Sequence, residues 1–270
     1  MIMRPIIALL TDFGLRDAFV ASMKGLILSI CSDVEIVDVT HEVNRFDVLH
    51  GALVLSSAAR YFPEGTIFVG VVDPGVGTRR RGIVIETERH IAVGPDNGLL
   101  SLLAEKEDVK GVYEIRRKEL TLDAPFETFH GLTVFSSVAA HIAKGVPPSL
   151  VGPRVEEYVR IRIPKPEVAG SEITARIIHV DQFGNLVTNV DLNTLRAVNV
   201  KEGAKLRFKF KGGGIEVPFE KAYGYVPEGE CVCVLDSYEF LELAVNQGDA
   251  SKKLGLGGGD VVKITVLPER

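Results

Sequence analysis

The first half of the chain alternates between continuous apolar runs and stretches in which apolar residues recur at helical spacing. Apolar side chains recur every three or four residues from Phe19 to Ile30, behind Asp17 as the expected N-cap, and a second helix is expected over 47–60. Three continuous apolar runs predict buried strands, at 6–10, 34–39 and 66–72. Strands that alternate with helices predict a mainly parallel sheet covered by helices.

Further short elements continue this pattern up to a proline-rich segment. Strands are expected at 83–86 and 91–93, and a helix is expected over 132–143. Five prolines then fall between Lys144 and Gly170, which disfavours a long helix and predicts a linker.

Beyond this segment the spacing of apolar residues changes to a period of two. Three segments show this spacing, at 173–180, 205–210 and 261–266. Such alternation is typical of half-buried strands and indicates a small β-barrel or sandwich. The sequence therefore predicts an α/β N-terminal domain with a mainly parallel sheet over 1–160 and an all-β C-terminal barrel domain over 161–270.

The composition is that of an ordinary globular protein. Of the 270 residues, 46% are hydrophobic and 25% are charged, and the formal net charge is −5. This balance argues against a nucleic-acid partner, because phosphate binding needs concentrated Lys and Arg. Three cysteines make neither a closed disulfide framework nor a zinc site, so we expect no metal. Because the sequence has no run of about eighteen apolar residues and no charged leader, we expect no membrane span and a cytoplasmic location.

One loop is the strongest candidate for chemistry. Residues 69–72 predict the end of a buried strand, and Asp73 follows directly. The glycines after Asp73 permit a tight return, which would bring one of the arginines at 79–81 toward this carboxylate. Ligands of open α/β sheets bind at such carboxyl ends of strands. A salt-bridged loop without chemistry explains the same residues equally well.

Three other residues could face the same strand ends. Asp12 ends the first strand, where a carboxylate can accept both hydroxyls of a ribose, and Phe13 could supply an apolar wall. His130 lies immediately before the helix expected over 132–143. Each also has a structural explanation, as a turn-forming Asp, a core Phe and a structural His.

The second half contains two polar turns. Asp181 and Asn185 flank Phe183 in a predicted hairpin, where an acid and an amide could recognise an ammonium group and a purine edge. Ser237 and Tyr238 could donate to a carboxylate or could merely turn the chain. Neither a nucleophile elbow, nor a P-loop, nor a His-Glu-x-x-His motif occurs, and the glycine spacing disfavours a nicotinamide enzyme.

Six short motifs, taken together and in order, resemble one family. They are LTDFG at 10–14, VDPGVGT at 72–78, GPDNG at 94–98, TFHG at 128–131, VDQFGN at 180–185 and LAVN at 243–246. Through them the chain is similar, nearly end to end, to the S-adenosyl-L-methionine (SAM) hydrolases, also called SAM hydroxide adenosyltransferases. These enzymes are related to the fluorinating and chlorinating enzymes.

The resemblance implies an α/β domain followed by a β-barrel, assembled as a homotrimer with each substrate site at a subunit interface. It also implies a hydrolase that cleaves SAM to adenosine and L-methionine. Water or hydroxide would attack C5′ of the ribose, without a metal or an organic cofactor.

Roles for individual residues follow from the same resemblance. Asp73, Arg80 and His130 correspond to the reacting set of the family, and Arg80 stands at the family's offset from the Asp. The other implied contacts are with substrate: Asp12 with the ribose hydroxyls, Asn185 with adenine, Asp181 and Ser237 with the methionine end, Tyr238 through its backbone, and, as weaker candidates for the pocket wall, Glu242 and the region of Asn246. The aromatic side chains of Phe13 and Phe183 are added to the expected substrate contacts from their places in the two turns.

Two alternatives remain open. One is halide transfer to give 5′-halo-5′-deoxyadenosine, but the halogenating relatives carry Tyr and Thr where this chain has Asp73 and Val76, Ser where it has Gly131, and no Arg at the position of Arg80. A buried carboxylate repels a halide, so water is the better nucleophile. The other alternative is a non-catalytic SAM or adenosine sensor that uses the same pocket.

Overall fold

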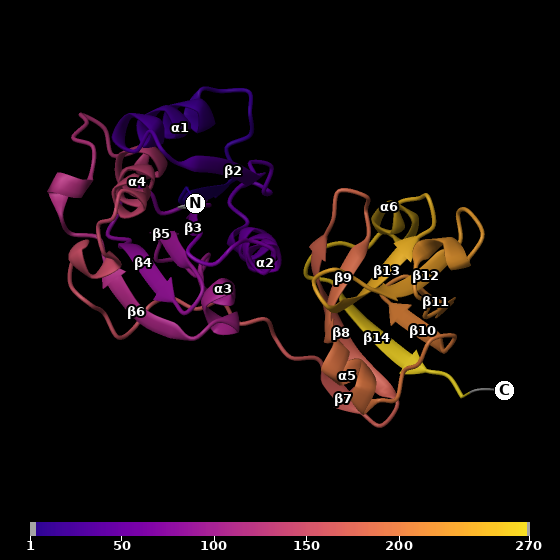
Figure 1. The fold of residues 1–270 in the computed structure, drawn as a ribbon. Coiled ribbons are helices and arrows are strands. Elements are labelled where there is room, and N and C mark those ends of the chain that lie inside the picture. The colour runs from indigo at the N-terminus through magenta and orange to yellow at the C-terminus, as the bar shows by residue number, and fades with distance from the viewer. Residues whose placement is uncertain (1–3, 269–270) are drawn as a thin grey trace. The chain divides into compact units, whose positions relative to one another are not determined.

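The computed structural model describes residues 4–268, and the chain forms two compact units, Met1–Ile161 and Arg162–Arg270 (Figure 1). Each unit has a sheet and a hydrophobic core of its own. The two units are therefore described in turn.

The N-terminal unit is built on a six-stranded mixed sheet. Its strands are β1 (Ile6–Thr11), β2 (Glu35–Thr40), β3 (Ile67–Val71), β4 (Gly82–Thr87), β5 (Ile91–Pro95) and β6 (Val109–Glu114), in the order β2-β1-β3-β5-β4-β6. The β2-β1-β3-β5 part is parallel, whereas β4 is antiparallel to both of its neighbours. Residues 88–90 are too few to make a crossover from β4, so β5 returns beside it as a hairpin. The sheet is thus mainly parallel, as expected, with an antiparallel part at β4 that the sequence did not predict.

Helices cover both faces of this sheet. They are α1 (Phe19–Ile30), α2 (Val48–Ala59), α3 (Ser101–Lys106) and α4 (Ser137–Ala143), with 3₁₀ turns η1 (Lys118–Leu120) and η3 (Pro148–Leu150) and a π-helical segment η2 (Gly131–Ser136). Met23 and Ile27 of α1 join the core with Ile7 and Leu9 of β1. On the other face, Gly51 allows α2 to approach the side chains of Leu10, Val72 and Leu99.

Several local expectations need correction. Asp17 is not an N-cap, because α1 begins at Phe19 with Ala18 in the capping position and no side-chain cap hydrogen bond. The helix expected over 132–143 is a π-helical turn that continues into α4. Strand β6 and helix α3 were not predicted, since both are short and their apolar pattern is weak.

The C-terminal unit is a nearly closed antiparallel barrel. Its strands are β7 (Glu167–Ala169), β8 (Glu172–Val180), β9 (Leu186–Asp191), β10 (Lys205–Phe210), β11 (Gly213–Pro218), β12 (Cys231–Leu235), β13 (Phe240–Val245) and β14 (Val261–Val266), in the order β11-β10-β14-β8-β9-β13-β12, with β7 beside β8. An isolated bridge between Phe219 and Cys233 brings the two edges together. Two short helices, α5 (Leu192–Ala197) and α6 (Ala250–Leu254), and the 3₁₀ turn η4 (Tyr223–Tyr225) accompany the strands, so this unit is not purely β.

The period of two in the sequence matches the barrel core. Alternate residues of β8, Ile173, Ala175 and Ile177, are fully buried, as are Phe208 of β10 and Ile264 of β14. Strand β9 is buried on both faces from Leu186 to Val190.

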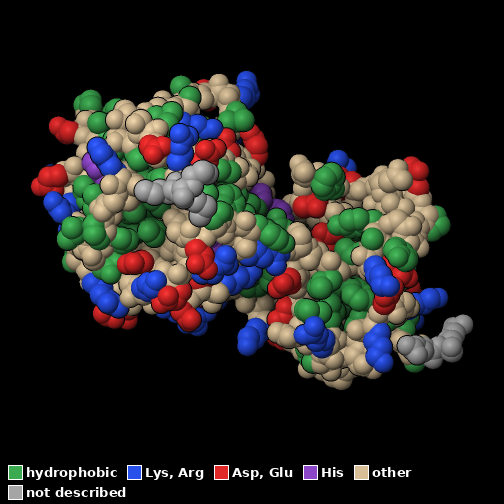
Figure 2. Space-filling view, in the orientation of Figure 1, with side chains coloured by type: hydrophobic (Ala, Val, Ile, Leu, Met, Phe, Trp, Pro, Cys, Tyr) green, Lys and Arg blue, Asp and Glu red, His purple; other side chains and the backbone are tan. Residues whose placement is uncertain are grey.

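Among residues 4–268, no helix has the length and apolar character needed to cross a bilayer. Basic and acidic side chains are interspersed on the face of each unit seen in Figure 2.

Candidate functional site

Two neighbouring strands bring the predicted acids of the first half to one edge of the sheet. β1 and β3 are parallel partners, with Thr11 opposite Val71. Asp12 directly follows Thr11, and Asp73 lies two residues after Val71. Both carboxylates therefore leave the sheet at its carboxyl end, the edge at which α/β proteins bind ligands.

The loop after Asp73 folds back on itself through local hydrogen bonds. The Val76 amide donates to the Asp73 carbonyl at 3.3 Å, and the Thr78 hydroxyl donates to the Gly75 carbonyl at 2.7 Å. Gly77 has a φ of 73°, a conformation that side-chain-bearing residues resist. This compact turn returns Arg80 to the end of β3, as the glycines of the loop predict.

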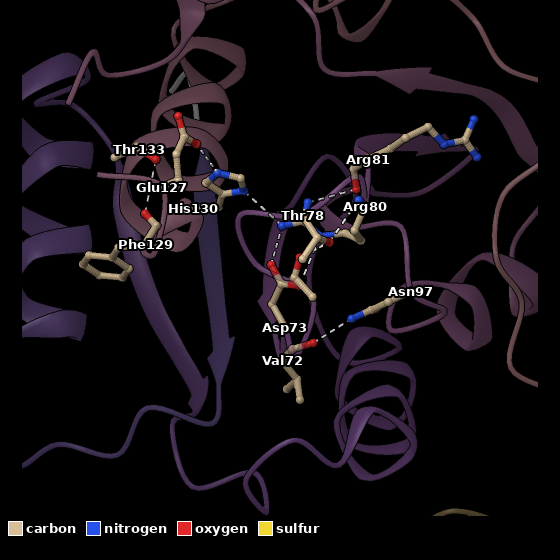
Figure 3. Close-up of polar contacts among 11 residues, drawn as sticks. Val72, Asp73, Thr78, Arg80, Arg81, Asn97, Glu127, Phe129, His130 and Thr133 are labelled. Carbon is tan, nitrogen blue, oxygen red and sulfur yellow. Dashed lines mark hydrogen bonds and ion pairs between the residues drawn. The ribbon is translucent and has the colours of Figure 1, made fainter. Parts of the chain in front are cut away.

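Arg80 contacts both of the other residues of the expected reacting set, Asp73 and His130 (Figure 3). Its Nε donates to Oδ1 of Asp73 at 3.1 Å and its Nη2 to Oδ2 at 2.5 Å, a two-point ion pair. Nη2 also donates to Nδ1 of His130 at 3.0 Å. The Arg80 and Asp73 side chains are only 9% and 4% exposed, so the charges meet out of bulk water. Arg79 is exposed and Arg81 pairs elsewhere.

The bond from Arg80 defines the tautomer of His130. A guanidinium can only donate hydrogen bonds, so Nδ1 of His130 must accept through its lone pair. The ring proton of neutral His130 therefore lies on Nε2. Nε2 lies 2.9 Å from Oε2 of Glu127, to which it donates. Glu127 is 80% exposed and was not predicted, because its place three residues before His130 carries no sequence signal.

Apolar groups complete the surroundings of this set. The Arg80 guanidinium lies over the ring of Phe135, 5.3 Å from its centroid. Phe13 packs against Phe19 and Phe129, with ring centroids 5.8 and 5.7 Å away. A Cβ on Gly131 would lie 3.2 Å from the Phe13 ring, so this ring borders the start of η2.

Asp12 is held in place by the backbone of a neighbouring loop. Its Oδ2 accepts from the Phe46 amide at 2.9 Å. No bond joins it to Arg80 or His130 among the described contacts. Each carboxylate oxygen has a second lone pair, so Asp12 retains the capacity to accept from ligand hydroxyls.

The C-terminal unit holds the second group of predicted residues in the β8–β9 turn. The Asn185 side chain donates to Oδ2 of Asp181, and the Asn185 amide donates to Oδ1, both at 2.9 Å. The Phe183 amide also donates to Oδ1, while its side chain is 65% exposed. The turn is therefore prearranged by Asp181 and presents an aromatic ring to solvent.

A buried acid lies near this turn. Glu242 is 3% exposed, and the Tyr223 hydroxyl donates to its Oε1 at 2.9 Å. Burial raises the pKa of Glu242 to about 7, and the charges of Asp236 and Asp181 add to the rise. Burial likewise raises the pKa of Asp236 to about 6. The carboxyl groups of Glu242, Asp236 and Asp181 thus lie in one region, which would favour binding of a cation. The sequence did not predict a role for Tyr223 or Asp236.

Of the remaining predicted residues, Ser237 and Tyr238 lie beside these acids and Asn246 does not. Ser237 and Tyr238 directly follow Asp236, whose Oδ1 accepts from the Tyr238 amide at 2.9 Å. Asn246 instead donates from its side chain to the Val226 carbonyl at 2.7 Å, away from the acids. Within residues 4–268, no cluster of three or more His, Cys, Asp or Glu side chains is arranged to hold a metal ion.

Comparison with known proteins shows which family this chain resembles. A family model described as the SAM hydroxide adenosyltransferase N-terminal domain matches residues 7–152. The model for the C-terminal domain of the same family matches residues 175–263. Together the two models account for most of both units.

Individual relatives cover almost the whole chain. The (R)-S-adenosyl-L-methionine hydrolase of Methanocaldococcus jannaschii is 35% identical, with 96% of this chain and 95% of the relative aligned. The protein of that name from Thermus thermophilus is 37% identical, with 97% and 100% aligned. A fluorinase from Nocardia brasiliensis is 32% identical, with 97% of each chain aligned.

Solved structures show the same similarity. An uncharacterized conserved protein from Thermotoga maritima superimposes with a TM-score of 0.90 at 38% identity, over 96% of this chain and 99% of the other. A conserved hypothetical protein from Thermus thermophilus gives a TM-score of 0.76 at 34% identity, over 98% and 100%.

Proposed function

Because the chain belongs to the SAM hydroxide adenosyltransferase family, we propose that it hydrolyses SAM to adenosine and L-methionine. The observation that carries this proposal is the meeting of Asp73, Arg80 and His130 at the carboxyl end of the sheet. Asp12 at the same edge is suited to ribose hydroxyls, and the acids of the C-terminal unit suit the ammonium group of methionine.

The difficulty of the reaction lies in the nucleophile. The sulfonium of SAM is already a good leaving group, whereas bulk water has a pKa of about 15.7 and hydroxide is scarce at neutral pH. Four of the five Arg80 N–H groups have acceptors in the described chain, which leaves one Nη1 hydrogen for the attacking water. A guanidinium in a shielded site stabilises the developing hydroxide.

The geometry favours Asp73 as the proton acceptor. Oδ1 of Asp73 accepts from Arg80 and keeps a second lone pair, whereas the single lone pair of His130 Nδ1 is engaged by Arg80. In this mechanism His130 orients Arg80, and Asp73 takes the proton as water attacks C5′. Holding water in line with C5′ and the sulfur could supply roughly 7–11 kcal/mol of the barrier reduction.

The decisive experiment is hydrolysis in ¹⁸O-labelled water. We expect the purified full-length protein to form adenosine and methionine from SAM, with the label in the 5′-hydroxyl of adenosine, as mass spectrometry will show. Arg80→Ala is the matched inactive control. Absence of product, or tight SAM binding without turnover, would contradict hydrolysis and favour the sensor.

Both epimers at sulfur should be compared. The relatives carry names that specify the (R) form, and we propose the same preference for this chain. Separate incubation with each epimer, followed by chromatography of adenosine, will give the ratio of kcat/KM values. Equal rates would contradict the preference and leave hydrolysis intact.

Halide transfer is the second candidate because fluorinases are among the relatives. The Asp73 carboxylate, 4% exposed, speaks against a halide at the same place, since buried like charges repel. We therefore expect no 5′-halo-5′-deoxyadenosine when the reaction is run in high chloride or fluoride.

The assigned roles separate by kinetics. Asp73→Ala should lower kcat by about 10²–10⁴-fold while KM changes little, because it removes the proton acceptor. His130→Ala should lower kcat by about 10²-fold or more with little change in KM, because Arg80 loses a contact that orients it. Asn185→Ala should instead raise KM, as expected of an adenine contact. Thr194→Ala, at a residue whose hydroxyl donates to Asp191 at the start of α5, is the matched control in the same unit.

We further propose that the active protein is a homotrimer with sites at subunit interfaces and without metal or organic cofactor. The support is that the predicted residues are divided between two units of the chain. Full activity after dialysis against a chelator is the expected result. The cytoplasmic location stays a prediction from the sequence.

A further inference from the structure

The GPDNG turn at 94–98 was singled out by the sequence but has no role in the chemistry above. It begins with the last two residues of β5, the neighbour of β3 in the sheet. Asn97 donates from Nδ2 to the carbonyl of Val72 at 2.8 Å (Figure 3). Val72 is the residue immediately before Asp73, so Asn97 holds the start of the Asp73–Arg80 loop.

The preceding residue of the turn holds the other end of that loop. Oδ2 of Asp96 accepts from Nε and Nη2 of Arg81, at 2.9 and 2.5 Å. The Asp96 amide donates to the Arg81 carbonyl at 2.9 Å. Arg81 immediately follows Arg80. Asp96 and Asn97 therefore form hydrogen bonds at both ends of the loop that carries Asp73 and Arg80.

The Arg81 carbonyl connects Asp96 to the Arg80 guanidinium. The Arg81 carbonyl accepts both from the Asp96 amide and from Nη1 of Arg80, the latter at 3.0 Å. A displacement of Asp96 would therefore be passed to Arg80 through a single peptide group. Arg80 would then lose part of its alignment with Asp73 and His130.

The turn is itself a fixed support. The Asp96 side chain is 3% exposed, and its Oδ1 accepts from the Val159 amide at 2.8 Å. Oδ1 of Asn97 accepts from the Leu99 amide at 3.1 Å. A Cβ on Gly94 would lie 2.4 Å from the Gly70 carbonyl, so β5 and β3 are in close contact beneath the turn.

We propose that Asp96 and Asn97 are positioning residues, which set the alignment of Asp73 and Arg80 by clamping both ends of their loop. This inference rests on the proposed hydrolysis. Positioning of this kind affects kcat more than KM, because the clamp does not touch substrate.

The test uses Asn97→Ala and Arg81→Gln in the full-length protein, each below its own unfolding temperature. We expect kcat to fall about 10- to 100-fold, because misplacement by about 1 Å has that effect. KM should stay within about threefold. Arg81→Lys, which can keep a charge opposite Asp96, should recover part of the lost kcat.

Ser101→Ala is the matched control. Ser101 donates to the Gly98 carbonyl and accepts from the Ile161 amide, so it stabilises the same segment without touching the loop. We expect kcat near that of the unaltered protein. If Asn97→Ala and Arg81→Gln lower kcat no more than Ser101→Ala does, the proposed positioning role of Asp96 and Asn97 is wrong.

Amide hydrogen exchange separates this inference from the proposed function. In Asn97→Ala, exchange at Val76 and Thr78 should accelerate by about tenfold or more, because their hydrogen bonds depend on the clamped loop. This readout needs no turnover. Absence of hydrolysis in the unaltered protein would refute the proposed function, whereas unchanged exchange in the variant would refute the clamp.

Discussion

At the scale of single residues, the main feature is a charge pair held out of water. The Asp73 and Arg80 side chains are 4% and 9% exposed and meet at two points. Removing both charges from such a pair is tolerated far better than removing one, because the remaining charge is then buried without a partner. Each charge of the pair therefore depends on the other to offset the cost of its burial.

Arg80→Met should therefore destabilise the protein by about 3–5 kcal/mol, whereas the double variant Asp73→Asn/Arg80→Met should recover much of that loss. Denaturant unfolding followed by circular dichroism gives the four free energies of the double-mutant cycle. Additive effects, with no coupling between the two positions, would contradict a buried pair.

A second residue-scale feature is the buried acid of the barrel unit. Burial raises the pKa of Glu242 to about 7 from an ordinary value of 4.5. Between these values the folded protein binds a proton that the unfolded chain does not. The resulting contribution to stability is complete below the lower value and is lost as the pH rises through the higher one.

We predict that the melting temperature of the unaltered protein falls from about pH 5 to about pH 8, and that Glu242→Gln flattens this dependence. The amide cannot ionise, so the part of the slope that comes from Glu242 disappears, while Asp236 still contributes. Calorimetry across this range is the measurement. Glu228→Gln, at an exposed position, is the control, and an equal flattening there would count against the assignment.

At the scale of elements, the loop after β3 and the segment before η2 form one contact. Gly77 has a φ of 73°, and a Cβ there would lie 3.1 Å from the Glu127 carbonyl. Glu127 in turn accepts from His130. The alignment of His130 with Arg80 therefore depends on how closely two stretches distant in sequence can approach.

Gly77→Ala should lower stability by about 1–2 kcal/mol through its left-handed backbone and should also lower kcat by displacing His130. Gly75→Ala is the matched control, since an added Cβ would meet its neighbours at 3.5 Å or more. Thermal unfolding and steady-state kinetics measure the two effects. Indistinguishable behaviour of the two variants would show that the Gly77 contact is unimportant.

At the scale of the whole molecule, each unit carries only part of the expected site. The reacting set and Asp12 belong to the N-terminal unit, while Asp181, Asn185 and Glu242 belong to the barrel unit. A trimer with sites at subunit interfaces would combine such parts from different subunits. This arrangement predicts that damaged subunits can complement one another.

Co-expressed Asp73→Ala and Asn185→Ala subunits should therefore regain activity that neither has alone. If each site in a symmetric trimer takes one unit from each of two subunits, random mixing leaves roughly a quarter of the sites intact. The assay uses mixed trimers at limiting SAM, with light scattering to establish the mass. Activity no higher than the average of the two parents would refute shared sites.

The sequence by itself determined the local elements and the place of the main loop. Helical spacing located α1 and α2, and alternation located β8, β10 and β14, because periodicity depends on which face of one element is buried. The turn after β3 was also predictable, since glycines favour tight returns wherever they occur. The residues alone left open which of three arginines faces Asp73, and the choice of Arg80 came from family resemblance.

Tertiary structure decided the partners. Several contacts join residues whose spacing in the sequence carries no pattern. They are those of Glu127 with His130, of Tyr223 with Glu242, of Asn97 with Val72 and of Asp96 with Arg81. The tautomer of His130 and the raised pKa of Glu242 follow from those partners and from burial. Hydrogen bonds and desolvation act over a few ångströms in space, whereas sequence periodicity reports only on neighbours along the chain, so these partners could be identified only from the packing.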